Sequence, residues 1–155
     1  MKDKELFDKI QKVNDVNSLQ PGRLNAMLDL KIKDCSRKES FAEFIYDVSE
    51  WALNPYNGVH GGIICSIFDT TMGIGSVALT ERFVTTTDIS VSFVKPMTGK
   101  QYSIQLQYNH IGKNMARCTG RAIDTETGIV CATAMGSFML LKNYSFDNFE
   151  KGIKL

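Results

Sequence analysis

The spacing of apolar positions changes several times along the chain, and each change predicts a new element. Between residues 3 and about 16 the apolar side chains recur at helical intervals, as Leu6, Phe7, Ile10 and Val13. This spacing predicts an amphipathic helix whose apolar face packs on the domain. Pro21-Gly22 then interrupts the pattern and predicts a break in the chain.

Two apolar segments follow, at 25–35 and 39–49, on either side of the polar turn Ser36-Arg37-Lys38. Their composition and the turn between them predict a β-hairpin. Trp51 follows at its edge, before a turn-forming stretch that begins with Asn54-Pro55.

Residues 61–80 are apolar on most sides, which predicts a helix buried inside the domain. Small and polar residues share one stripe about 120° wide when positions are placed 100° apart. The stripe would allow another helix or a substrate to approach closely, although a close packing contact without chemistry has the same pattern. Its members are Gly62, Ser66, Asp69, Thr70, Gly73 and Ser76.

Four strand-like segments complete the chain, at 85–95, 101–110, 114–124 and 129–141, with turns rich in Gly and Thr between them. A hairpin, a long apolar helix and a meander of strands fit one antiparallel sheet wrapped around one central helix. The fold class is therefore α+β, with an extra helix at the N-terminus. We expect a single domain over residues 1–155.

Composition narrows the possible functions. The chain has 155 residues, 43% of them hydrophobic and 23% charged, which is typical of one globular domain with its own core. A net charge of +1 gives no general attraction to nucleic acid or to membranes. The first residues are charged and lack a signal core, and no unbroken apolar run approaches membrane-spanning length. We expect a cytoplasmic protein without nucleic-acid or membrane partners.

The cysteines are widely spaced, without a Cys-x-x-Cys pair, and His60 and His110 are the only histidines. We therefore expect buried free thiols and no metal site. A catalytic Cys65 is less favoured, since no histidine is placed locally to activate it.

The segment from His60-Gly61-Gly62 to Asp69 holds the strongest chemical signal. The glycines would let a ligand reach backbone N–H groups at a helix start, where the dipole favours negative charge. Asp69 is a carboxylate in an apolar helix, and such a group is costly without a partner or a task. Eight residues of helix rise about 12 Å, so one carbonyl cannot touch both Gly61 and Asp69 of one chain. If both act together, Asp69 must come from a second subunit.

A set of motifs then resembles the hot-dog-fold acyl-CoA thioesterases of the phenylacetate-pathway (PaaI-like) type. The resemblance spans about residues 25–141 and leaves 1–24 and 142–155 outside, as an N-terminal helical extension and a C-terminal tail. Lys95 stands where the family more often has Arg, which keeps the charge without the bidentate geometry. The matching residues are Asn54-Pro55, Gly58, His60-Gly61-Gly62, Asp69, Thr86, Asp88, Lys95-Pro96, Gly99 and Gly112-Lys113.

The resemblance implies a hydrolase that cleaves acyl-CoA thioesters and works as a homodimer or a dimer of dimers. Gly61 N–H would hold the oxyanion, and Asp69 would act as nucleophile or general base. Asn54 would orient the thioester or the water, and His60 would shape the loop. Thr86 would assist near Asp69, with Thr85 or Thr87 as alternatives because one residue of spacing is lost.

Coenzyme A would enter as part of the substrate, so no separate cofactor is expected. The resemblance points to 93–98 and 110–115 for its nucleotide, with Lys95 and Lys113 at the phosphates. The residues it designates are Phe93, Val94, Lys95, Pro96, Gly112 and Lys113.

Two other functions remain open at this point. A hot-dog hydratase or dehydratase would use His60 with a carboxylate, but the adjacent glycines and Asn54-Pro55 argue against it. A non-catalytic acyl-CoA sensor would usually need an output module. The first 24 residues hold one helix at most, so we expect no DNA-reading module there, and the presence of both Asp69 and the Gly61 donor also argues against a sensor.

Overall fold

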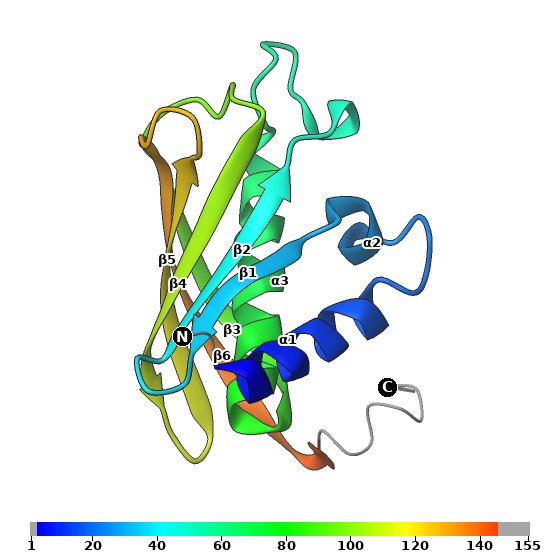
Figure 1. Ribbon diagram of the computed structural model, residues 1–155, viewed down its shortest axis with the longest axis vertical. Coiled ribbons are helices and arrows are strands. Elements are labelled where there is room, and N and C mark those ends of the chain that lie inside the picture. The colour runs from blue at the N-terminus through cyan, green and yellow to red at the C-terminus, as the bar shows by residue number, and fades with distance from the viewer. Residues whose placement is uncertain (1–2, 146–155) are drawn as a thin grey trace.

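The computed structural model describes residues 3–145, with side chains described to Lys142. Six antiparallel strands form one sheet in the order β1-β2-β4-β5-β6-β3, curved around a long helix (Figure 1). The strands are β1 (Lys31–Ser36), β2 (Phe41–Asp47), β3 (Arg82–Phe93), β4 (Gln101–Ile111), β5 (Met115–Asp124) and β6 (Val130–Ser145). This is the α+β arrangement that the sequence predicts, and the hot-dog fold is confirmed.

The central helix α3 (Gly61–Thr80) lies on the inner face of the sheet, as its apolar pattern predicts. Phe68 and Met72 are fully buried there. By length and composition α3 could cross a membrane, although the sequence has no unbroken apolar run of that length. More than half of its apolar window is buried inside the protein, as in the core helix of a globular domain.

The N-terminal helix α1 (Lys4–Asn17) packs against α3 and the edge strand β1. Its apolar face contributes Leu6, Ile10 and Val13, each at most 1% exposed. Lys9 also forms an ion pair with Glu81, directly after α3. The helix outside the family resemblance is therefore built into the core.

Asp3 fixes the beginning of α1. Its carboxylate accepts hydrogen bonds from the backbone N–H of Leu6, at 3.1 Å, and of Arg37, at 3.0 Å. These bonds hold the pKa of Asp3 below its ordinary value.

Strand β3 lies at the edge of the sheet and pairs with β6 on one side only. Thr86 lies opposite Phe138 and Asp88 lies opposite Ser137, so Thr87 is an extra residue in a β-bulge. Its hydroxyl donates to the Ser137 carbonyl at 3.0 Å. Because side chains alternate between faces, the extra residue changes which positions of β3 face α3.

Several predicted boundaries differ from the observed ones, and three differences are the largest. Residues 25–28, predicted as strand, belong to the short helix α2 (Leu24–Leu28). Strand β1 starts only at Lys31, after Asp29 at a left-handed φ of 46°. Strand β3 starts at Arg82 rather than 85, and β6 continues into the expected tail as far as Ser145. The remainder of that tail, 146–155, lies outside the described residues. Trp51 is in a single 3₁₀ turn (Glu50–Ala52).

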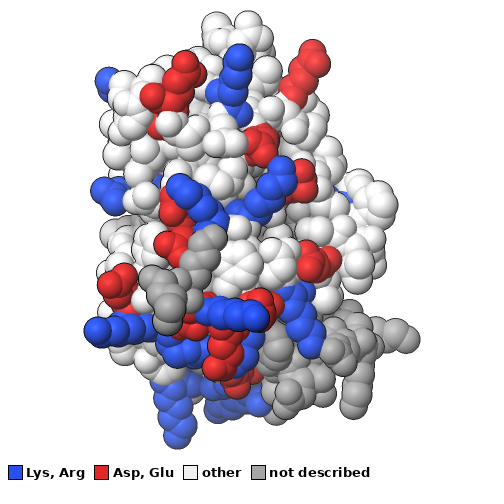
Figure 2. Space-filling model, in the orientation of Figure 1, with Lys and Arg blue, Asp and Glu red and all other residues white. Residues whose placement is uncertain are grey.

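Acidic and basic side chains are interleaved on the face seen in Figure 2, with both signs over the same regions. This distribution agrees with the net charge of +1 and gives that face no extended field of one sign.

Candidate functional site

The loop before α3 is held by Asn54. Its side-chain oxygen accepts hydrogen bonds from the backbone N–H of Tyr56, at 2.9 Å, and of Gly58, at 3.2 Å. The backbone of Asn54 also bonds to the Gly58 carbonyl at 2.8 Å. These bonds close the turn and leave the amide nitrogen of Asn54 without a hydrogen bond to any described residue.

His60 caps the start of α3. Its Nδ1 accepts a hydrogen bond from Gly62 N–H at 3.1 Å, and its backbone N–H donates to the Ala52 carbonyl at 2.8 Å. Among the described residues, nothing accepts a hydrogen bond from Gly61 N–H. The helix dipole favours negative charge at this end, so Gly61 offers a free donor for an oxyanion.

A cavity of about 310 Å³ adjoins this donor, and we call it the Gly61 cavity. A Cβ at Gly61 would lie 3.3 Å from the ring of Phe93, so the glycine allows close approach of strand and helix. Six of the predicted residues line the cavity: Asn54, Gly61, Phe93, Val94, Lys95 and Pro96.

Asp69 meets Thr86 two turns further along α3. The Thr86 hydroxyl donates to Asp69 Oδ1 at 2.6 Å. Thr86 faces the helix because its partner in the sheet is Phe138, which is buried. Of the three candidate threonines, Thr86 is therefore the one that contacts the carboxylate.

A second cavity, of about 230 Å³, opens beside this pair, and we call it the Asp69 cavity. It lies between α3, β3 and β6, and Gly73 and Phe138 are among its walls. It contains Asp69 and Thr86 but none of the residues predicted around Gly61. One chain thus holds two separate parts of the predicted site.

The remaining predicted residues, Gly112 and Lys113, lie elsewhere. Arg82, at the start of β3, donates to the Lys113 carbonyl at 2.8 Å. At the other end of the strand, Phe93 is its last residue and Lys95 follows two residues later. Twelve residues of strand span about 36 Å at roughly 3.3 Å each, so one chain does not bring the two predicted nucleotide segments together.

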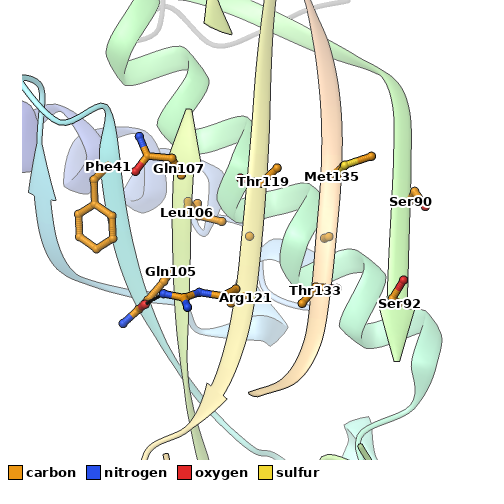
Figure 3. A pocket seen from close by; sticks show the side chains of 12 residues that line it. Phe41, Ser90, Ser92, Gln105, Leu106, Gln107, Thr119, Arg121, Thr133 and Met135 are labelled. Atoms are coloured by element: carbon orange, nitrogen blue, oxygen red, sulfur yellow. Dashed lines mark hydrogen bonds between the residues drawn. The ribbon is translucent and has the colours of Figure 1, made fainter. Parts of the chain in front are cut away.

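A larger cavity, of about 500 Å³, lies on the outer face of the sheet, away from α3 (Figure 3). Serine, threonine and glutamine side chains line it, and Arg121 donates to Gln105 there at 2.9 Å. It contains none of the predicted catalytic or coenzyme A residues.

Three of the four cysteines are buried. Burial raises the pKa of Cys118 to about 12 and also raises the pKa of Cys131, which opposes thiolate formation. Cys35 is buried as well, and Cys65 is half-buried. Among residues 3–145, no group of three or more His, Cys, Asp or Glu side chains could hold a metal ion.

Among the residues of the Asp69 cavity that sequence reasoning missed are Val13 and Asn17 of α1 and Asn25 of α2. They come from the region around the N-terminal extension, to which no site was assigned. Val13 belongs to the apolar face of α1, which gave a signal for burial. The two asparagines follow no pattern that could have indicated a cavity.

Known proteins resemble this chain in sequence and in fold. A family model described as the thioesterase superfamily matches residues 56–131, which include Gly61, Asp69 and Thr86. Among curated proteins, none matches the sequence.

Several solved structures share the fold. The PaaI protein from the phenylacetic acid degradation operon of E. coli superposes with a TM-score of 0.75 at 18% identity, over 90% of this chain and 98% of that one. A thioesterase family protein from Silicibacter pomeroyi gives 0.73 at 23% identity, over 84% and 96% of the two chains. A Streptococcus mutans protein bound to acetyl-CoA gives 0.66 at 17% identity, over 73% and 89%.

The family match covers the central helix and most of the strands that follow it, and the similar structures share the sheet and its helix. The resemblance seen in the sequence motifs is thereby confirmed for the superfamily and for the fold. The chain matches the thioesterase superfamily over residues 56–131 and has a hot-dog fold like that of PaaI.

Proposed function

We propose that the protein hydrolyses acyl-CoA thioesters to a free acid and coenzyme A. One observation carries this proposal: helix α3 presents two groups suited to thioester hydrolysis in two separate cavities. Gly61 offers a free N–H in one cavity, and Asp69 offers a carboxylate bonded to Thr86 in the other. The match of residues 56–131 to the thioesterase superfamily supports the reaction class. The acetyl-CoA bound to the Streptococcus mutans relative supports a coenzyme A thioester as ligand.

Gly61 N–H and the Asp69 carboxylate can act on the same carbonyl only if they come from different subunits. Gly61 and Asp69 are about 12 Å apart along α3, too far to act on one carbonyl. Strand β3 is an edge strand, whose unpaired backbone groups offer a place for a second copy. Antiparallel pairing of two β3 strands would bring Gly61 of one copy towards Asp69 of the partner subunit, and two-fold symmetry makes two equivalent sites.

The same pairing of two β3 strands would bring together the two segments predicted to bind the nucleotide of coenzyme A. In an antiparallel pair, the Phe93 end of one β3 lies against the Arg82 end of the other. Lys95 then approaches Lys113 of the partner subunit, which the single chain keeps at the far end of the strand. Each lysine offers a point charge to a phosphate group.

In this site the thioester oxygen accepts a hydrogen bond from Gly61 N–H, which stabilises the negative charge that develops there. Asp69 either attacks the carbonyl carbon or takes a proton from a water that attacks it. The carbon–sulfur bond breaks in both routes. In the first, the acyl group passes to Asp69 as an anhydride, which water then cleaves to the free acid and the restored carboxylate, and the leaving thiolate takes a proton from solvent water. In the second, water adds to the carbonyl carbon, and the proton that Asp69 took from it passes to the leaving thiolate. Thr86 holds one carboxylate oxygen, so the other is directed at the reaction.

The principal test is release of free thiol from a panel of acyl-CoA thioesters by the wild type and by Asp69→Asn. The variant keeps the shape of the side chain, so fold and ligand binding should persist. Turnover should fall by at least ~100-fold, the scale of a positioned acid–base group. Near-normal turnover in a folded variant would overturn this role of Asp69.

Mixed dimers test the shared site. Asp69→Ala and Asn54→Ala proteins, each inactive alone, are refolded together to form dimers with one intact site. Partial recovery of activity is expected, since one site of the mixed dimer would have both parts unchanged. Verified mixed dimers without activity, or an active monomer, would count against a shared site.

Addition of water to an enoyl-CoA, measured in parallel, tests the alternative hydratase activity. That activity would use His60, whose Nδ1 already accepts the hydrogen bond that caps α3.

A further inference from the structure

The Asp69 cavity has a wall that lies largely outside the family resemblance. Val13 and Asn17 come from the last turns of α1, and Asn25 comes from α2. Val13 is 1% exposed and packs in the core, and Lys9 holds α1 to the residue after α3. This wall is therefore a fixed part of the cavity that opens beside the predicted catalytic carboxylate.

The size of the cavity limits what it can hold. At about 30 Å³ for each water-sized group, 230 Å³ corresponds to roughly eight non-hydrogen atoms. Along α3 the walls run from Asp69 to Val77, about 12 Å of helix. A short acyl group or a single ring fills this space, whereas a long alkyl chain would extend beyond it.

The chemistry of the wall is mixed. Apolar side chains such as Ile74, Phe83 and Phe138 line one part. Asn17 and Asn25 are half-buried, and neither side chain forms a hydrogen bond with another described residue. The neighbouring Asn14, in contrast, donates to the Leu30 carbonyl at 2.7 Å. An amide beside a cavity without a protein partner favours a ligand that can bond to it.

We propose that the N-terminal segment forms the acyl-binding wall, and that Asn17 and Asn25 select a short acyl group with a hydrogen-bonding atom remote from the thioester. This inference rests on the proposed thioesterase function and names its substrate class. Asn17 and Asn25 determine specificity and take no part in the chemical step.

The test compares kcat/KM for hexanoyl-CoA, ω-hydroxyhexanoyl-CoA and decanoyl-CoA. One net hydrogen bond should favour the hydroxylated substrate over hexanoyl-CoA by about threefold to tenfold. Decanoyl-CoA should be the poorest substrate. In the double variant Asn17→Leu and Asn25→Leu, hexanoyl-CoA should become the better substrate of the first two. Gln11→Leu, which removes an amide bonded to Asp15 on the same helix, should leave the ratio unchanged.

A second variant reduces the cavity from the opposite wall. A Cβ at Gly73 would lie no closer than 3.8 Å to a neighbour, so Gly73→Ala fits without a clash and fills about one of the eight atom positions. It should lower kcat/KM for hexanoyl-CoA by about fivefold or more relative to acetyl-CoA.

The outcomes separate the two proposals. If the wild type releases thiol from no acyl-CoA, the proposed function is wrong. If it hydrolyses them but prefers decanoyl-CoA, or if neither the double variant nor Gly73→Ala changes the substrate ratios, the acyl-binding wall is wrong and the thioesterase function stands.

Discussion

A single methyl group at Gly75 should destabilise the protein strongly. Gly75 lies on α3 one and a half turns after Asp69, where the helix meets Tyr108 of β4. A Cβ built at this position would lie 1.9 Å from the Tyr108 hydroxyl oxygen and 2.8 Å from Cζ. That hydroxyl donates to the Met72 carbonyl at 3.0 Å in the core. The methyl group and the hydroxyl cannot both keep their positions.

The cost follows from these contacts. Overpacking a core typically costs about 1–3 kcal/mol, and a buried hydroxyl without its partner costs about 1–3 kcal/mol more. We expect Gly75→Ala to lower the free energy of unfolding by about 3–4 kcal/mol. At about 2–4 °C per kcal/mol, Tm should fall by roughly 6–16 °C. Alanine normally stabilises a helix interior relative to glycine. A decrease in the free energy of unfolding would therefore identify the clash with Tyr108.

Urea denaturation of four proteins measures the effect: the wild type, Gly75→Ala, Tyr108→Phe and the double variant. Tyr108→Phe alone should cost about 0.5–1.5 kcal/mol. The double variant should be more stable than Gly75→Ala, because the closest contact is gone. Gly73→Ala, two residues earlier, is the control: its Cβ would make an ordinary contact at 3.8 Å, so the variant should be neutral or stabilising. A Gly75→Ala loss below about 1 kcal/mol, or additive effects in the cycle, would refute this reasoning.

Further predictions concern ligand binding, pH and thiol reactivity. Replacing Lys95 and Lys113 by alanine should raise KM for acyl-CoA several-fold with little change in kcat, and should not affect an acyl-pantetheine thioester; equal losses on both would make these lysines structural. Because hydrogen bonds lower the pKa of Asp3, its charge stabilises the fold above the unfolded pKa and ceases to do so as pH falls through the folded pKa. Asp3→Asn should therefore reduce stability at neutral pH, with a difference that shrinks towards about pH 2; a constant difference would contradict this. A thiol reagent at about pH 8 should label half-buried Cys65 before Cys118, as followed by mass spectrometry; the reverse order would be inconsistent with the burial that raises the pKa of Cys118 to about 12.

The fold could be predicted from the sequence where periodicity decides the structure. Leu6, Ile10 and Val13 recur every three or four residues, and a helix is the element that places them on one face. The unbroken apolar character of 61–80 likewise indicated a buried helix. Around residue 25 the same reasoning failed, because the one-turn helix α2 and the left-handed Asp29 are too short to leave a period.

The candidate site could be predicted only in part from the sequence. The positions of Gly61 and Asp69 along one helix showed that a single chain separates them, since helix rise is a fixed quantity. The identity of the threonine beside Asp69 could not be resolved, because it depends on a bulge that leaves no mark in composition. Asn17 and Asn25 could not be found either, since tertiary packing alone brings them to the cavity.

The bulge at Thr87 makes the number of residues in β3 as important as their identity. Val84 and Thr86 face the helix before it, and Ile89, Val91 and Phe93 face the helix after it, because one extra residue exchanges odd for even positions. Deleting Thr87 would turn either the threonine away from Asp69 or the apolar residues away from the core. Thr87 has no role in the proposed hydrolysis, yet β3 tolerates a change in length least at this residue. Insertions and deletions, rather than substitutions, are the changes to which this strand is most vulnerable.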